Sequence, residues 1–331
     1  KPEFMKTSIS RRKFLGTAAT AAAAFTVIPV INSCGSGSGQ KKPNSKVGGV
    51  QLGCTTYSYR SMPHKVDDVI GYLLLAGINS IELRLVGEED LGIPPMPQRP
   101  RGQEMTDEQK AEFAKQMDAA REAQRQWRLT LPMSKYEDMR KKFNNAGIDV
   151  HILKFAPSAW SDEEIDYAYN AAKALGSIGI TDEYSEMAIN RLGKFAEKHK
   201  SLAMYHTHGQ PAEPGFSFDP IFAASPANYL NLDAGHYYGA TGLHPNDIII
   251  KYHDRMRSIH IKDKTGPNST PAGVNRPFGK GETPIADILL LLKKEKWPIS
   301  VDIELEYEIP EGSDAAKEVA TCIEYMRNIL E

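Results

Sequence analysis

Eight short runs of β-branched and aliphatic residues recur between Val50 and Glu306, separated by segments with helical periodicity. Strands that alternate with helices build parallel βα units, and eight such units close a (β/α)8 (TIM) barrel. An open doubly wound sheet is the alternative, but no glycine-rich fingerprint follows the first run. We therefore predict one barrel domain over residues 50–331. The expected strands are 50–56, 78–85, 148–155, 177–183, 201–206, 228–233, 256–263 and 299–306.

Amphipathic helices are expected between these strands, for example over 163–175 and 284–294, and a last helix from about Asp314. An insertion at about 87–146 interrupts the pattern. Its first part, 87–106, is rich in Pro and Gly and is expected to be an irregular loop.

Two helices, at about 107–128 and 134–146, are then expected before the third strand. The excess lies after the second strand, where it can serve as a lid or as a structural elaboration.

The N-terminal residues are not expected to be part of the barrel. Residues 1–4 read as a cloning remnant. Residues 5–34 resemble a twin-arginine signal peptide, with the pair Arg11-Arg12 followed by Lys-Phe-Leu and then a small-residue apolar stretch. That stretch is too short to span a hydrocarbon core of ~30 Å.

The signal ends in Ile-Asn-Ser-Cys, which resembles a lipobox, so Cys34 is either lipidated or removed with the signal. Residues 35–49 are expected to be a flexible linker. These features predict a protein of the periplasm or cell envelope, with membrane contact only through the N-terminal anchor in the case that Cys34 is lipidated. Cys54 and Cys322 are expected to be small buried side chains, with a disulfide between them as the alternative.

The charge of the barrel domain disfavours nucleic acid as a partner. Eight of the 40 Lys and Arg residues but one of the 42 Asp and Glu residues lie in residues 1–46, which leaves 32 basic and 41 acidic side chains, a net charge of −9. A surface of this sign repels phosphate backbones.

Ionisable side chains gather at the ends of the predicted strands, where barrels carry their chemistry. Such groups near one axis must be paired, shifted in pKa or bound to a cation. Four consecutive strands end in a mixed set of His and carboxylate, which suits Mn²⁺, Zn²⁺ or Co²⁺ better than the all-oxygen sets of Mg²⁺ and Ca²⁺. The predicted metal ligands are His206, Asp233, His260 and Glu304.

Four segments resemble the xylose isomerase-like TIM-barrel family, the sugar phosphate isomerases/epimerases: LDAGHYYG, SIHIKD, GKGETPI and DIELEYE. The resemblance runs from about Val50 to the C-terminus. It implies a divalent ion, commonly Mn²⁺, held by Asp233, His260, Glu304 and a residue of the fifth strand. Many relatives have Glu-x-His there, whereas this chain has His206-Thr207-His208.

The same resemblance implies proton transfer by two metal-bound glutamates on opposite faces of the substrate. Here the catalytic candidates are Glu304, His206 and Glu183, the last as a replacement for the missing glutamate. A metal ion that chelates a carbonyl and its neighbouring hydroxyl stabilises the enediolate left by proton removal. Isomerisation, epimerisation and β-elimination share that intermediate.

Further residues at the strand ends are candidates for substrate contact. Aromatic rings can form a sugar-binding wall, with ordinary packing as the alternative, and lysines can polarise hydroxyls or form salt bridges. Gly235 is expected to turn the chain sharply. The candidates are Tyr57, Arg84, Lys154, Trp160, His208, His236, Lys262 and Lys280.

The sequence therefore predicts an exported, metal-dependent enzyme that removes a proton next to the carbonyl of an unphosphorylated sugar or keto-sugar, since exported enzymes meet few sugar phosphates. Mn²⁺ is the expected ion, with Zn²⁺, Co²⁺ and Mg²⁺ as alternatives. A 3-keto-glycoside lyase and a non-catalytic carbohydrate-binding barrel are the competing functions. A homo-oligomer is compatible with the sequence, and the related DNA-repair endonucleases are disfavoured by charge.

Overall fold

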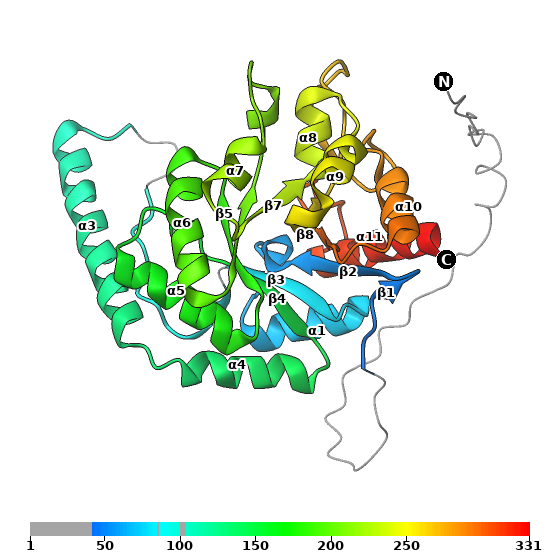
Figure 1. The fold of residues 1–331 in the computed structure, drawn as a ribbon. Helices are drawn as coiled ribbons and strands as arrows, with labels where there is room; N and C mark the ends of the chain where they lie inside the picture. Colours follow the sequence, from blue (N-terminus) through cyan, green and yellow to red (C-terminus); the bar gives the residue numbers. More distant parts are fainter. Residues whose placement is uncertain (1–41, 85, 100–103) are drawn as a thin grey trace, which may run out of the picture. The chain divides into compact units, whose positions relative to one another are not determined.

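A computed structural model describes residues 42–84, 86–99 and 104–331. Eight parallel strands form a closed barrel, because the first and second strands of the barrel, β2 and β3, also pair with each other (Figure 1). The order around the barrel is β2, β11, β8, β7, β6, β5, β4 and β3. The strands are β2 (Val50–Thr55), β3 (Ser80–Arg84), β4 (Asp149–Lys154), β5 (Gly179–Glu183), β6 (Leu202–His206), β7 (Asn228–Asp233), β8 (Met256–Ile261) and β11 (Ser300–Ile303). The predicted TIM-barrel fold is confirmed.

Helices surround the barrel in Figure 1. They begin at recognisable caps: in α5, Ser161 accepts from the backbone of Glu164 while the Glu164 side chain accepts from Ser161 N, and Gly176 ends the helix at φ 82°. The helices are α1 (Val66–Ala76), α2 (Val86–Asp90), α3 (Asp107–Thr130), α4 (Ser134–Asn145), α5 (Asp162–Leu175), α6 (Glu186–His199), α7 (Asp219–Ala224), α8 (Ala234–Thr241), α9 (Pro245–Tyr252), α10 (Ile285–Glu295) and α11 (Ala315–Leu330), with short 3-10 turns η2 (Thr56–Tyr59), η3 (Gln210–Ala212) and η4 (His253–Arg255).

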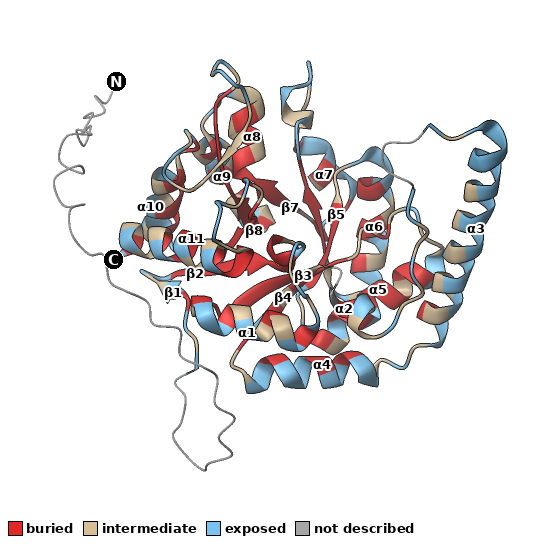
Figure 2. Cartoon of the chain, turned by 180° about the vertical axis from the view of Figure 1, so that it is seen from behind, coloured by how far each residue is buried: buried red, intermediate tan, exposed pale blue. Residues whose placement is uncertain are grey.

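The strands are buried on both faces (Figure 2), which explains why they read as apolar runs and not as alternating patterns. One polar layer lies inside the barrel, where Asp302 accepts from Ser258 Oγ at 2.6 Å and lies 2.9 Å from Nε2 of His151. Gly53 leaves room for it, since a Cβ there would lie 2.4 Å from an oxygen of Asp302. The interior is therefore polar well below the strand ends.

The predicted strands agree with the structure except near the last two. The expected strand 256–263 is two elements, β8 and the short β9 (Asp263–Lys264), which pairs with β10 (Asn275–Arg276). The expected strand 299–306 ends at Ile303. Beyond these ends the backbone leaves the sheet, and the side chains contact partners at the barrel mouth.

The prediction of an irregular loop over 87–106 was wrong at its start, because α2 occupies Val86–Asp90. Glycine disfavours a helix here, but tertiary contacts outweigh that preference: Arg128 of α3 pairs with Glu88 of α2 at 2.8 Å and with Glu164 at 3.0 Å. Residues 91–99 are irregular, as expected.

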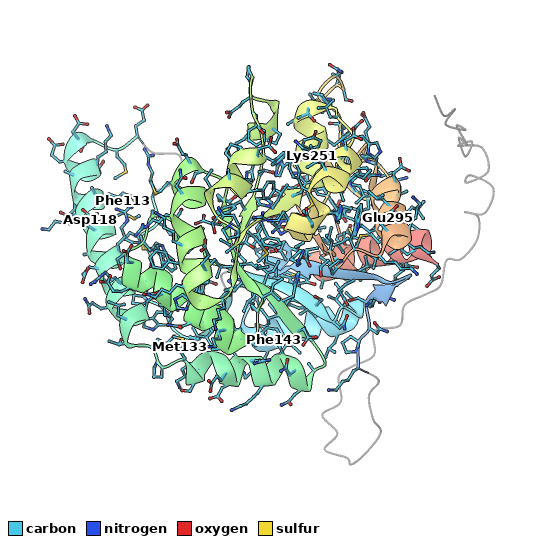
Figure 3. All side chains as sticks on the ribbon, viewed as in Figure 1. Phe113, Asp118, Met133, Phe143, Lys251 and Glu295 are labelled. Atoms are coloured by element: carbon cyan, nitrogen blue, oxygen red, sulfur yellow. The ribbon has the colours of Figure 1, made fainter. Side chains whose placement is uncertain are left out.

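The long helix α3 forms the outer edge of the molecule (Figure 1) and is mostly exposed (Figure 2). Phe113 and Asp118 lie on its outlying part, and Met133 begins the turn into α4 (Figure 3). Of the residues of α3, Arg128 alone is buried. The described part of the insertion thus braces the outside of the barrel at α5.

The predicted signal peptide and residues 35–41 of the predicted linker lie outside the described residues. The end of that linker differs from expectation, because β1 (Lys46–Val47) pairs with β2 and Ser45 is buried. Cys54 and Cys322 are buried and free. Within the described ranges, no helix has the length and apolar character needed to cross a bilayer.

Candidate metal centre

The four predicted ligands converge at the C-terminal ends of β6, β7, β8 and β11. His206, Asp233, His260 and Glu304 each offer a donor atom, and these atoms lie within 4.8 Å of one another. All four residues are at most 3% exposed. We call these residues the four-residue cluster.

Asp233 uses its two oxygens differently. Oδ1 accepts from the backbone N–H of His236 at 2.7 Å and caps α8. Oδ2 has no hydrogen-bond partner in the described structure and lies 2.9 Å from Nζ of Lys262. Gly235 lies in the first turn of α8, where the chain passes directly from β7 into the helix and a Cβ would approach Cγ of Lys262 to 2.3 Å.

His260 lies between two carboxylates. Its Nδ1 is 3.1 Å from Oε2 of Glu304, and its Nε2 is 3.1 Å from Oε2 of Glu82. Burial opposes protonation, but Glu82 and Glu304 raise the pKa of His260 well above its usual value. Although burial alone would raise the pKa of Glu82, His260 and Lys154 lower it to about 2.

His206 has the opposite character. Burial, Lys154 and His260 lower the pKa of His206 well below its usual value, so the ring is neutral at physiological pH. Its Nδ1 is buried without a hydrogen-bond partner in the described part of the chain. A neutral imidazole with a free nitrogen is the form that binds a metal.

Lys262 is the cation of the cluster. Its Nζ lies 2.9 Å from Asp233, 2.8 Å from Glu304 and 2.6 Å from Glu306. Burial opposes the charge, but these carboxylates raise the pKa of Lys262, and despite its own burial Glu304 has a pKa well below the usual range because of Lys262 and His260. The predicted substrate lysine therefore neutralises two of the predicted ligands.

The donor set fits a divalent ion. Two imidazoles and two carboxylates match a borderline metal, and one of the imidazoles, His206, has a buried nitrogen without a hydrogen-bond partner in the described part of the chain. Because His260 is protonated between two carboxylates, an ion that binds its Nδ1 must release that proton, so metal affinity falls at low pH.

A second group of donors lies beside the first. Glu183, His206 and His208 offer atoms within 4.8 Å of one another. Glu183 is 2.7 Å from Nζ of Lys154 and 3.3 Å from Nε2 of His208. Burial raises its pKa, but His208 and Lys154 outweigh that effect and lower it to about 2. The predicted replacement carboxylate is thus ionised and adjacent to His206.

Two predicted substrate residues stack above this group. The rings of His208 and His236 lie 4.8 Å apart with an interplanar angle of 14°. Burial, opposed by Asp233 and reinforced by Lys262, lowers the pKa of His236, which also lies 3.6 Å from Glu306. These two imidazoles are partly exposed and lie at the entrance to the four-residue cluster.

The remaining candidates lie further out. Tyr57 and Arg84 contact each other at the mouth, with Cζ of Arg84 4.0 Å from the ring centroid. Cζ of Arg128 lies 3.7 Å from the centroid of the Trp160 ring, so one face of this ring packs against the insertion. Lys280 is exposed on the turn between β10 and α10, and its role as a substrate contact stays a prediction.

That turn is organised by a single carboxylate. Asp263 accepts from the backbone N–H groups of Gly279, Gly281 and Thr283 at 2.8–3.1 Å. Gly281 has no space for a Cβ, which would lie 2.2 Å from Asp263. The turn at GKGE is therefore wrapped around Asp263, two residues beyond the end of β8.

Three residues of the site were not assigned a role from sequence: Glu82, Asn231 and Glu306. Asn231 donates to Glu82 at 3.0 Å and lies 3.4 Å from His260. Each lies two residues from a candidate that the sequence did identify. Because residues two apart on a strand face the same side, this spacing could have shown that they point into the site. Their partners belong to other strands or to the segments that follow them, which only barrel closure brings near.

Solved structures with this arrangement of strands and helices are known. A sugar phosphate isomerase/epimerase from Parabacteroides distasonis is 15% identical with a TM-score of 0.55, the match covering 89% of this chain and 98% of that one. The barrel shares its fold with sugar isomerases and epimerases.

Two further isomerase/epimerase barrels match with a TM-score of 0.54. A 3-keto-D-glucoside 4-epimerase from E. coli is 11% identical over 84% of this chain and 99% of its own. A D-psicose 3-epimerase is 13% identical over 85% and 99%. No protein-family profile and no curated protein matches the sequence. These identities establish the fold alone.

Proposed function

We propose that this protein is a metal-dependent enzyme that removes a proton next to the carbonyl of an unphosphorylated sugar or keto-sugar and returns it to give an isomer or epimer. The observation that carries the proposal is the convergence of His206, Asp233, His260 and Glu304 at the strand ends of a closed barrel. Mn²⁺ is the proposed ion, because the set mixes nitrogen and oxygen donors.

The bound ion supplies Lewis acidity, which stabilises the negative charge that develops on the sugar oxygens. The chain supplies the proton transfer. Glu304 and Glu183 are both ionised carboxylates, and each lies beside a member of the four-residue cluster: Glu304 next to His260, Glu183 within reach of His206. We assign one of them the role of base, which takes up the proton and returns it to the neighbouring carbon in isomerisation. In epimerisation the other carboxylate delivers a proton that it has first taken up from solvent, and neutral His206 is the alternative acceptor.

The imidazoles of His208 and His236 and the ammonium of Lys154 lie where they can hold sugar hydroxyls. Their stacking and ion pairing fix their positions before substrate arrives. Pre-placed polar groups of this kind lower the entropic cost of reaching the reactive geometry.

Metal content is the first test. Purified protein should hold about one divalent ion per chain, and an Asp233→Ala/His260→Ala variant should hold almost none. Asp166→Ala/His199→Ala is the matched control, because it removes an Asp–His pair of 2.7 Å on the outside of the barrel. Equal metal in all three proteins would remove the basis of the assignment.

Deuterium exchange is the second test. Incubation of the metal-loaded protein with neutral sugars, uronates and keto-sugars in D₂O should place solvent deuterium on one carbon. A complete absence of exchange over the panel would favour a non-catalytic carbohydrate-binding barrel.

A 3-keto-glycoside lyase is the second candidate, favoured by His206 in the place where two-carboxylate relatives have Glu. It would release the aglycone by β-elimination from the same intermediate. Product analysis with a 3-keto-glycoside separates the two: elimination frees the aglycone, whereas epimerisation leaves the glycosidic bond intact.

We also propose export to the periplasm or cell envelope, on the arginine pair and lipobox-like end of residues 5–34. Cell fractionation of the full chain and of an Arg11→Lys/Arg12→Lys variant tests this, since the variant should stay in the cytoplasm. The proposed partner is a carbohydrate, not a nucleic acid.

A further inference from the structure

Arg84 ends β3 at the barrel mouth. Side chains two residues apart on a strand share a face, and Glu82 points into the barrel to reach His260. Arg84 therefore points to the same side, about 7 Å further along the strand. Its register partner on β4 is Lys154, which also faces inward and pairs with Glu183.

The Arg84 guanidinium is held against an aromatic ring. Its Cζ lies 4.0 Å from the centroid of Tyr57, and Cζ of Arg60 lies 4.4 Å from the same centroid. Arg60 is engaged by the main chain, since its guanidinium donates to Leu305 O at 2.7 Å and Tyr57 O at 3.2 Å. Contact with the Tyr57 ring holds the Arg84 guanidinium in place, and within residues 42–84, 86–99 and 104–331 this group makes no hydrogen bond.

Arg84 differs from the other cations of the mouth. Lys154 is neutralised by Glu183, and Lys262 by three carboxylates. Over residues 42–84, 86–99 and 104–331, no carboxylate oxygen lies within 4 Å of the Arg84 guanidinium. A half-buried guanidinium with five donors in a planar fork matches the two oxygens of a carboxylate.

We propose that Arg84, held on Tyr57, binds the carboxylate of an acidic sugar at the end remote from the reacting carbons. The inference rests on the proposed function, because it places the reacting end at the four-residue cluster. Arg84 lies two residues beyond Glu82 on β3, towards the barrel mouth, so an elongated ligand can contact both Arg84 and the cluster. A sugar acid would thus have its carbonyl end at the cluster and its carboxylate on Arg84.

The probes are D-glucuronate, D-galacturonate and D-mannuronate, their neutral counterparts D-glucose, D-galactose and D-mannose, and the corresponding 6-phosphates. Binding to metal-loaded protein is measured by titration calorimetry. At least one uronate should bind about tenfold or more tighter than its neutral counterpart, as expected for hydrogen bonds to a charged group. A 6-phosphate that binds more tightly than every uronate overturns the assignment to a carboxylate.

Arg84→Gln should remove the preference for the acid, weakening the binding of that uronate about tenfold more than the binding of its neutral counterpart. Arg84→Lys, which keeps the charge but loses the fork, should retain part of the preference. Arg121→Gln is the control, since Arg121 is exposed on α3 and pairs with Asp118. Equal loss for acidic and neutral sugars in Arg84→Gln, or no binding of any uronate, overturns the inference.

The two proposals fail separately. If uronates bind in a way that depends on Arg84, but the protein holds no metal and shows no deuterium exchange, the carboxylate site is supported and the catalytic proposal fails. Deuterium exchange together with uronate binding that Arg84→Gln leaves unchanged keeps the catalysis and removes the carboxylate site.

Discussion

Nε2 of His260 lies 3.1 Å from Oε2 of Glu82, on the opposite edge of the ring from Glu304. Glu82 therefore holds the Nε2–H and leaves Nδ1 facing the other donors of the four-residue cluster. Carboxylates that orient a metal-binding imidazole in this way also raise its basicity.

Glu82→Gln should weaken metal binding by about 10–100-fold, the usual effect of removing such a partner. Glutamine can still accept from Nε2–H, so the ring orientation is kept and the loss reports the charge. Competition with a chromogenic chelator gives the affinity. Glu137→Gln, on the exposed face of α4, is the control, and equal affinities in both variants would contradict the role of Glu82.

Lys262→Met should destabilise the metal-free protein by about 3–5 kcal/mol, because three carboxylates lose their buried counter-ion. Mn²⁺ should restore much of that loss, since the ion takes over the role of the ammonium. Thermal unfolding with EDTA and with MnCl₂ should therefore show a larger metal-induced rise in Tm for the variant than for the wild type.

Lys251→Met is the matched control, because Lys251 is 57% exposed on α9 and pairs with Asp219 at 3.4 Å (Figure 3). An exposed pair contributes about 1 kcal/mol or less. If Lys262→Met were no less stable than Lys251→Met without metal, Lys262 would not be the resident cation.

Much of this site could be predicted because strand periodicity alone places its residues. Asp233, His260 and Glu304 end runs that a parallel barrel must close, so their convergence follows from topology. The partnership of Glu82 with His260 could not be predicted, because it crosses the barrel between strands that are far apart in sequence. The helix α2 was missed for a related reason: its anchor, Arg128, lies in a different helix of the insertion.

Arg128→Met should destabilise the protein by about 3 kcal/mol, because Glu88 and Glu164 lose a buried partner. The damage should be concentrated in the insertion. Limited proteolysis mapped by mass spectrometry should show earlier cleavage within 86–130, ahead of the barrel. Arg121→Met, which breaks an exposed pair, should change stability by less than about 0.5 kcal/mol; cleavage spread evenly over the chain in Arg128→Met would contradict the anchoring role.

The stability of the metal-free protein should fall on the acid side in two stages. His206 has a lowered pKa in the folded state, so the unfolded chain takes up its proton first and stability decreases as the pH drops below about 6.5. Glu82, with its pKa lowered to about 2, stabilises the fold above its unfolded value, and this contribution is lost as the pH falls from about 4.5 towards 2.

His206→Gln isolates the first stage. Between pH 7 and 5 the stability of the wild type should fall relative to this variant by about 2 kcal/mol, the linkage expected for one histidine that stays neutral when folded. Urea unfolding with EDTA at each pH measures the difference, and His244→Gln, at the exposed start of α9, is the control. A pH-independent difference would mean that His206 has the same pKa in the folded and unfolded chain, and a difference of the opposite sign would mean that it is protonated when folded; either result contradicts a neutral, free metal ligand.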